Sequence, residues 1–320
     1  MTTPIAVGLS AVIVAADGVS PYALCTRGAD GETGLPHGRF DPQGHRTFEL
    51  GLRDWVRAQT GFEPGYVEQL YTFGDRGREL PQADLGDNAP RDARLISVGY
   101  LGLTPVKTDI SAFDAVWRDW YRPFPWEDHR KGRPAIVDEA LGPALAKWAD
   151  TGGKDAAERL RRAQVAFGLE GRPWIEERTL ERYELLYEAG LAPEAVRDRG
   201  KDRKAISVPA AALGEPMISD HRRILATAIG RLRGKIKYRP VVFELMPERF
   251  TLLDLQKVVE SILGLPLHKQ NFRRALDRSG LVVGLGQFTQ AAGGRPAELF
   301  KFRREVLREG HASGVQTPRG

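Results

Sequence analysis

Residues 251–302 carry a closely spaced series of helix and turn signals that few folds can accommodate. A helix is expected over Thr251–Leu263, with an N-cap candidate at its first residue and Gly264 at its end. After a short turn, a second, basic helix is expected over His268–Ser279, and glycines then punctuate a hairpin over 281–302. The order of helix, tight turn, basic helix and hairpin predicts a winged helix-turn-helix.

Charge is distributed unevenly along this chain of 320 residues, whose formal net charge is +5. Residues 221–320 contain 19 Lys and Arg against 8 Asp and Glu, whereas residues 1–220 contain 28 against 34. A basic half of this kind is typical of proteins that bind a polyanion, because the release of condensed counterions contributes to affinity. The charge pattern alone also fits a basic surface that is only solvated.

The N-terminal part alternates between strand and helix patterns. The expected elements are strands over Ile5–Ala16, Pro21–Arg27, Val67–Phe73 and Leu95–Leu103, a Gly- and Pro-rich loop over Gly28–Gly44, and an amphipathic helix over 47–59. Gly61 lies where that helix would stop. This order predicts an α+β fold and excludes a purely helical bundle.

Residues 111–213 change to a helical character, which we interpret as an insertion. One helical face is shared by four apolar residues, Val137, Leu141, Leu145 and Trp148. A basic helix over 221–236 follows. The sequence therefore predicts a first domain over 1–238 that contains the insertion, a winged helix-turn-helix over 239–308, and a flexible tail over 309–320.

The chain carries no pattern typical of export or of metal binding. The apolar run Ile5–Ala16 is broken by Gly8 and Ser10, and no basic segment precedes it. We therefore expect neither a signal peptide nor a membrane span, and a cytoplasmic protein. Cys25 is the single cysteine and the six histidines lack metal-ligand spacing, so neither an internal disulfide nor a structural zinc site is expected.

The segment Leu35–Pro42, with the helix that ends at Gln59–Phe62, resembles a Nudix box. The family consensus is G-x5-E-x7-R-E-U-x-E-E-x-G-U, in which glutamates hold a divalent cation on a pyrophosphate and help to activate water. That chemistry needs several carboxylates around a hard cation. When this sequence is aligned with the consensus on Gly61, Asp54–Gln59 takes the place of the R-E-U-x-E-E stretch, and the three glutamates of that stretch are absent.

The rest of the box also departs from the consensus. Arg46 takes the place of the upstream glutamate, and Gly38 lies two residues too far upstream. Glu49 and Asp54 are the nearest carboxylates, and two such residues are more often part of a solvated helix face. We therefore expect no catalytic residue, no bound metal and no hydrolase activity. The alternative is an active Nudix pyrophosphatase that acts on ADP-ribose-like substrates.

Several further motifs follow the degenerate box in order. They are Tyr66–Asp75, Ile96–Tyr100, an H-x-x-I-L-x-x-A-x-x-R-L pattern from His221 to Leu232, Phe250–Gln256, His268–Arg274 and Gly294–Ala297. With the box, they closely resemble the Nudix-related transcriptional regulators of NAD metabolism, the NrtR type, over residues 1–110 and about 217–305. The helical stretch between them is longer than that family's usual connection, and larger alphaproteobacterial NAD regulators of similar design are the nearest analogy.

The resemblance implies a fold and a function. The fold would be a Nudix-like α/β/α sandwich with a helical insertion and a C-terminal winged helix-turn-helix. The function would be that of a ligand-responsive repressor of NAD biosynthesis genes, which needs no cofactor and senses ADP-ribose, NAD or ATP through a non-catalytic Nudix domain. Its partners would be double-stranded operator DNA and a second copy of the chain, since such regulators usually pair to span two half-sites. An adaptor whose winged helix binds protein remains a third hypothesis.

The candidate DNA-binding residues lie mostly in the second helix of the motif, where Phe272 and Leu276 should face the core. The residues expected to meet base edges are Lys269, Gln270, Asn271 and Arg274. The residues expected to contact phosphates are Arg273, Arg278, Arg222, Arg223, Arg231 and Arg233. Arg295, at the predicted wing, would enter a minor groove or touch phosphate. For each of them the alternative is a solvated surface residue.

The candidate ligand-binding residues follow from their positions in the resemblance: Arg39, Phe40, Phe73 and Asp75. An arginine can pair with a phosphate, and an aromatic ring can stack on adenine. Core packing is an equally good interpretation of the two phenylalanines. Asp75 would, in the alternative, stabilise the turn after its strand.

Overall fold

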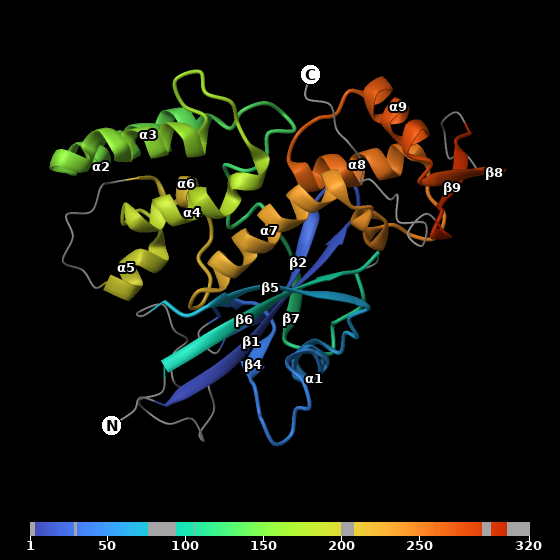
Figure 1. The fold of residues 1–320 in the computed structure, drawn as a ribbon, viewed down its shortest axis with the longest axis horizontal. Coiled ribbons are helices and arrows are strands. Elements are labelled where there is room, and N and C mark those ends of the chain that lie inside the picture. Colours follow the sequence, from blue (N-terminus) through green and yellow to red (C-terminus); the bar gives the residue numbers. More distant parts are fainter. Residues whose placement is uncertain are drawn as a thin grey trace.

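A computed structural model describes residues 4–28, 31–75, 94–105, 107–199, 208–289 and 296–305. Its centre is a mixed sheet (Figure 1) made of β1 (Ile5–Ala16), β2 (Pro21–Arg27), β3 (Thr33–Gly34), β4 (His37–Arg39), β5 (Tyr66–Phe73), β6 (Arg94–Leu103) and β7 (Ala115–Asp119). The strand order is β3-β2-β1-β6-β5, with β4 paired to β1 and β7 paired to β2. β1 and β6 are parallel, and the other pairs are antiparallel.

Helices cover both faces of this sheet. The first is α1 (Phe48–Thr60), and the long α7 (His221–Tyr238) lies on the opposite face. The alternation of side chains along β1 explains this arrangement, because Leu9, Ala11 and Ile13 pack with α1, whereas Val12 and Val14 pack with α7. α1 begins at the side-chain cap of Thr47 and ends at Gly61, whose φ is 66°. The predicted α/β/α sandwich is confirmed.

The helices that lie between β7 and α7 in the sequence cover the side of α7 that faces away from the sheet (Figure 1). Its α-helices are α2 (Gly142–Asp150), α3 (Ala156–Phe167), α4 (Thr179–Glu188), α5 (Pro193–Arg199) and α6 (Ala210–Leu213). A π-helical turn, η2 (Val137–Leu141), and 3-10 turns η3 (Gly153–Asp155) and η4 (Glu176–Arg178) join them. All four apolar residues expected on one helical face, from Val137 to Trp148, are buried. We call residues 120–199 and 208–213 the helical segment.

Two expectations about local structure were wrong. The helical stretch was expected from residue 111, but Ala115–Asp119 forms β7 and pairs with β2. The loop expected over Gly28–Gly44 contains β3 and β4, which pair with β2 and β1. β3 and β4 are only two and three residues long, and β7 has five residues and pairs with a strand about ninety residues earlier in the sequence, so no local pattern marks them.

The C-terminal domain has the predicted order of elements. A 3-10 turn, η5 (Val241–Leu245), precedes α8 (Leu252–Leu263) and α9 (Lys269–Ser279), and β8 (Val282–Phe288) pairs with β9 (Glu298–Phe302). Thr251 and Asp254 form a reciprocal capping box at the start of α8. Phe250 bonds to Phe300 in both directions and so adds a third segment to the hairpin. The predicted tail over 309–320 lies outside the described residues.

Within the described ranges, no helix is both long enough and apolar enough to cross a membrane.

Candidate functional site: a basic helix and the region around β4 and α1

The exposed face of α9 carries most of the predicted DNA-binding residues. Phe272 and Leu276 are its buried residues, as expected from their spacing, and they pack into the core beneath α8. The side chains left on the outer face are those of Lys269, Gln270, Arg273, Arg274 and Arg278, which are exposed, and that of Asn271, which is half-buried. An eleven-residue helix anchored by two apolar residues therefore presents four cations to solvent.

The hairpin beside α9 has the position of a wing. Phe243 stacks on Phe302 with ring centroids 4.2 Å apart, which fixes β9 against the start of the domain. Arg249 donates to Oε1 of Gln287 at 3.2 Å, and Phe288 is exposed on the same hairpin. The predicted wing residue Arg295 lies outside the described residues.

The arginines of α7 correct the prediction of phosphate contacts. Arg222 and Arg233 have no exposed surface, and each is paired with a buried carboxylate, Glu194 or Glu127. Arg223 is largely covered and makes ion pairs within the protein, so only Arg231 among the four is exposed. Three of these arginines therefore belong to the interior, because the helical segment covers the side of α7 that faces away from the sheet.

The α1 helix shows which contacts are made at positions where the Nudix consensus has glutamates. The indole of Trp55 lies over Gly38, where a Cβ atom would come within 2.1 Å of the ring, and its Nε1 donates to the carbonyl of Arg39 at 2.9 Å. Gln59 donates to the carbonyl of His37 at 2.7 Å and accepts from its amide at 3.0 Å. Two positions that hold glutamates in the consensus thus fasten the helix to β4.

The remaining carboxylates of α1 are used in local ion pairs. Glu49 lies 2.8 Å from Arg53 one turn later, and Asp54 lies 2.8 Å from Arg57. Both pairs are on the exposed face of the helix, as the sequence suggested for a solvated carboxylate pair. Among the described residues, no three His, Cys, Asp or Glu side chains are grouped so that they could hold a metal ion.

The four predicted ligand-binding residues do not form one group. Arg39, on β4, and Phe73, on β5, stand in one row across the sheet, because Arg39 pairs with Gly8, Gly8 with Ser97, and Ser97 with Phe73. Strand alternation directs this row to the α7 face. Phe40 instead packs on the α1 face, with its ring 4.6 Å from that of Phe48.

Phe73 and Asp75 meet a residue that the sequence interpretation assigned to DNA. The guanidinium of Arg223 lies 5.3 Å from the ring centroid of Phe73 and 2.6 Å from a carboxylate oxygen of Asp75. Glu184 and Asp220 contact the same guanidinium at 2.8 and 3.1 Å. Burial lowers the pKa of Arg223, but the surrounding carboxylates raise it and set the net direction, so the group stays charged. No local pattern in the sequence distinguishes the largely covered Arg223 from the exposed Arg231 on the same helix.

Two histidines stand near the other end of this row. Nδ1 of His221, at the start of α7, accepts a hydrogen bond from the amide of Leu35 at 3.0 Å, and its ring lies 4.7 Å from that of His37. Burial lowers the pKa of His221 well below its usual value, so its ring is neutral. Gly34 leaves room for Ile218, which precedes α7, because a Cβ atom at Gly34 would lie 2.6 Å from that side chain. The α7 face therefore offers Arg39, His37 and Arg223 along one edge.

Comparison with known proteins assigns the C-terminal domain. Residues 242–302 match the NrtR DNA-binding winged helix domain. Over these residues the chain is therefore similar to the NrtR-type winged helix. A curated relative, the ADPR responsive transcriptional repressor NtrR of Acinetobacter baylyi, is 43% identical over 83 residues, which cover 26% of this chain and 33% of the relative. The match thus spans about a third of that relative's length.

Solved structures extend the likeness to the whole fold. NrtR of Shewanella oneidensis in complex with a 27mer DNA superposes with a TM-score of 0.57 at 18% identity, covering 98% of this chain and 99% of that one. A MutT/nudix family protein from Enterococcus faecalis gives a TM-score of 0.51 at 14% identity, covering 95% and 88%. The chain therefore shares its overall fold with these two proteins.

Proposed function

We propose that this protein is a ligand-responsive repressor that binds operator DNA of NAD biosynthesis genes through its NrtR-type winged helix. The observation that carries the proposal is the outer face of α9, which consists of Lys269, Gln270, Asn271 and three arginines. This helix lies within the residues that match the NrtR DNA-binding winged helix domain. Arginine and lysine pair with guanine edges, and asparagine and glutamine pair with adenine edges. Arg273 and Arg278 would contact phosphates, with Arg295 at the wing.

The proposed effector is ADP-ribose or a related adenine nucleotide, NAD or ATP, bound by the Nudix domain. The curated relative that is 43% identical over 83 residues is named as ADPR responsive, which supports this choice of ligand. Arg39, Phe73 and Asp75 remain candidates on the α7 face, with Arg223 as an added cation there. Phe40 would bind only from the opposite face of the sheet.

Sensing without hydrolysis is part of the proposal. Trp55 and Gln59 stand where the consensus has glutamates, and both hold β4 through hydrogen bonds. A carboxylate cage around a cation would require these positions. Incubation of the purified protein with ADP-ribose and Mg²⁺ should release no AMP above the level without protein. Sustained release of AMP by the wild-type protein, absent from a control incubation without the protein, would establish the pyrophosphatase alternative instead.

The proposal also includes a homodimer and a cytoplasmic location, where operator DNA and adenine nucleotides are available together. Winged-helix and helix-turn-helix regulators commonly bind as pairs to half-sites about one helical turn apart. Light scattering on the eluting protein, with and without a duplex carrying two half-sites, measures the number of copies.

Fluorescence anisotropy tests the function itself. The full-length protein is titrated onto labelled duplexes from promoters of NAD biosynthesis genes and onto unrelated duplexes of equal length, each with ADP-ribose, NAD or ATP added. We expect selective binding that one nucleotide alters. Equal binding to both duplexes would contradict the proposal and favour the adaptor hypothesis.

A further inference from the structure

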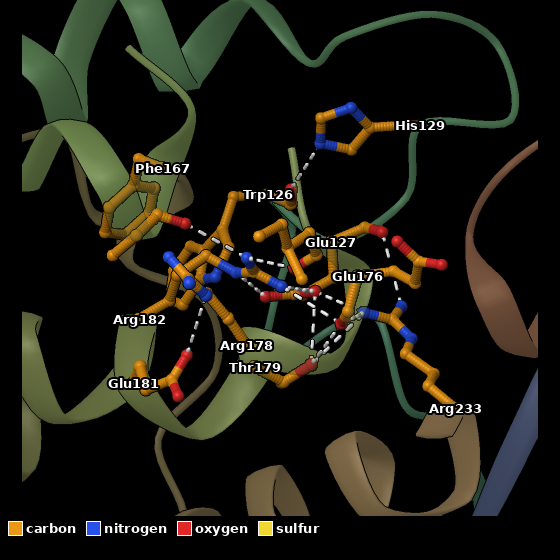
Figure 2. A network of polar contacts seen from close by, with 12 residues as sticks. Trp126, Glu127, His129, Phe167, Glu176, Arg178, Thr179, Glu181, Arg182 and Arg233 are labelled. Atoms are coloured by element: carbon orange, nitrogen blue, oxygen red, sulfur yellow. Dashed lines mark hydrogen bonds and ion pairs between the residues drawn. The ribbon is translucent and has the colours of Figure 1, made fainter. Parts of the chain in front are cut away.

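A fully buried carboxylate, Glu127, joins two helices of different parts of the chain (Figure 2). Its oxygens accept from Nε and Nη2 of Arg182, on α4, at 2.5 and 2.9 Å, and also from Nη1 of Arg233, on α7. Thr179 donates to the same carboxylate at 3.3 Å. The side chains of Glu127, Arg182 and Arg233 have no exposed surface. We call these three residues and Thr179 the Glu127 cluster.

The Glu127 cluster and its neighbours hold the end of α8, the first helix of the winged helix domain. Nε of Arg233 donates to the carbonyl of Ile262 at 2.8 Å, and the hydroxyl of Tyr121 donates to the carbonyl of Ser261 at 2.6 Å. The amide of His129 donates to the carbonyl of Gly264 at 2.7 Å. Carbonyls in the last turn of a helix have no partner within the helix, so these three bonds satisfy groups that would otherwise be unpaired.

Gly264 fits this contact closely. Its φ of 69° lies in the left-handed region, and a Cβ atom would come within 2.4 Å of the carbonyl oxygen of Glu127 and 2.9 Å of the Tyr121 hydroxyl. Gly264 is therefore required twice, as the C-cap of α8 and as the point of closest approach to residues 121–129.

The fixed end of α8 leads directly into the DNA-binding helix. Gln256 donates to the carbonyl of Leu267 at 3.0 Å, and Glu260 accepts from the amide of Leu267 at 2.9 Å, so the turn before α9 is tied back to α8. α9 begins at Lys269, five residues after Gly264. The start of α9 is thus tied to the end of α8 that Arg233 of the Glu127 cluster contacts.

α7 and α4, the two helices that meet at Glu127, also contact the candidate ligand face. α7 carries Arg223 near its start and Arg233 ten residues later, and α4 carries Glu184 and Arg182. Arg223 pairs with Glu184 at 2.8 Å and with Asp75 at 2.6 Å, beside the β5 edge of the sheet. α4 and α7 are thus joined by ion pairs at two levels, one at the proposed sensing face and one at α8.

From these contacts we infer that the Glu127 cluster is a positioning site: it sets the orientation of the winged helix relative to the Nudix domain and couples the sensing face to α9. The helical segment then has a regulatory role, because it supplies Tyr121, Glu127, His129 and Arg182. The inference deepens the proposed repressor function and rests on it for the coupling, whereas the orientation itself can be measured without any ligand.

Charge in the cluster supports a holding role. Burial raises the pKa of Glu127, but the two guanidinium groups outweigh this effect and lower it, so the carboxylate is ionised. Removing the charge leaves two buried cations without their shared partner, which favours an opening of the cluster that lets water reach them.

The test measures orientation in the full-length chain. Spin labels are attached at Ala58→Cys on α1, which packs on the sheet, and at Asp277→Cys on α9; both positions are exposed, while the native Cys25 is buried. We expect one narrow distance distribution in this background and a broadened or shifted one after Glu127→Gln. The matched control is Glu194→Gln. Glu194 is an equally buried carboxylate that pairs with Arg222, which lies on α7 as Arg233 does, but the hydrogen bonds of Glu194 go to Met217 and Arg222 and not to α8.

A milder pair of variants keeps the test decisive if Glu127→Gln does not fold. Tyr121→Phe removes only the hydroxyl that bonds Ser261, and Tyr187→Phe removes a hydroxyl that bonds Asp198 elsewhere in the helical segment. We expect the first to broaden the distance distribution and the second to leave it unchanged. Equal broadening by a variant and its control, or no broadening by either Glu127→Gln or Tyr121→Phe, would overturn the inference.

Coupling is measured with the same proteins. If a nucleotide changes wild-type DNA affinity by a factor in the usual range of about 5 to 150, Glu127→Gln should reduce that factor to no more than about twofold, with Glu194→Gln close to wild type. An unchanged factor in Glu127→Gln would contradict the coupling. A wild-type protein that neither binds DNA selectively nor responds to nucleotide would remove the proposed function, while the distance measurement would still decide the positioning role.

Discussion

α7 and α9 are both basic helices, but they use their charge in opposite ways. On α7, Arg222 and Arg233 are fully buried and paired with carboxylates, whereas the arginines of α9 are exposed and lack an acidic partner among the described ion pairs. The difference lies in what covers each helix. α7 lies between the sheet and the helical segment, while α9 rests on α8 by one face only. A count of basic residues therefore does not locate a nucleic-acid surface.

The close approach of the helical segment to α7 is visible at one glycine. A Cβ atom on Gly230 would lie 2.7 Å from the carbonyl oxygen of Glu177, in η4. The absence of a side chain lets η4 cross α7 at short range, and Arg233 is then enclosed one turn later. The predictions below test whether buried and exposed arginines differ as this comparison requires.

The largest expected effect is on stability at α7. Arg233→Met should lower the free energy of unfolding by about 3 to 5 kcal/mol, because it leaves Glu127 buried with one of its two cationic partners missing. Arg278→Met on α9 should change it by less than about 0.5 kcal/mol, as usual for an exposed residue. Urea unfolding of both variants measures the difference, and equal midpoints would end the distinction between the two helices.

The next effect is on stability at acid pH, where buried histidines matter. Burial lowers the pKa of His129 from 6.5 to about 4, so the folded state stays neutral where the unfolded chain takes up a proton. Stability is therefore complete above pH 6.5 and falls as the pH drops towards 4, by up to about 1.4 kcal/mol per pH unit for one proton.

His129→Gln should flatten this pH profile. A slope will remain, because the buried His221 also lowers stability as the pH falls. The backbone bond from residue 129 to Gly264 survives the substitution, so the contact with α8 is retained. Thermal unfolding at a series of pH values from 4 to 7 measures the slope. Parallel profiles for wild type and variant would show that His129 is not protonated on unfolding in this window.

DNA recognition by α9 gives the third effect. Arg274→Ala should weaken binding to the selective duplex by about 1 to 3 kcal/mol, or roughly 5- to 150-fold, and unrelated duplexes by less. The matched control is Arg161→Ala on α3, an exposed arginine in the helical segment. An unchanged affinity on electrophoretic mobility shift would remove Arg274 from the base-reading set.

The smallest effect concerns a phosphate contact. Arg278→Ala should weaken selective and unrelated duplexes alike and make the slope of log affinity against log salt less negative by about 0.9, the value for one phosphate contact. Anisotropy titrations at several salt concentrations measure this slope. A loss confined to one sequence would instead place Arg278 among the base-reading residues.

The sequence by itself determined the local elements with strong signals. α8 begins after Thr251 and ends before Gly264, and α1 ends before Gly61, as expected. The basic face of α9 points outward because Phe272 and Leu276 are spaced to face the core. These outcomes depend on caps, glycine conformations and helical periodicity, which act over a few residues. The absence of glutamate from residues 54–59 is likewise read directly from the sequence.

Only the tertiary structure decided which faces are covered. It buried Arg222 and Arg233 beneath a segment from another part of the chain, paired β7 with β2, and put Arg39 and Phe40 on opposite faces of the sheet. It also brought Arg223 to Asp75, which lies 148 residues away in the sequence. Burial and ion pairing between distant segments depend on how the elements pack, and that packing is not encoded in any local pattern.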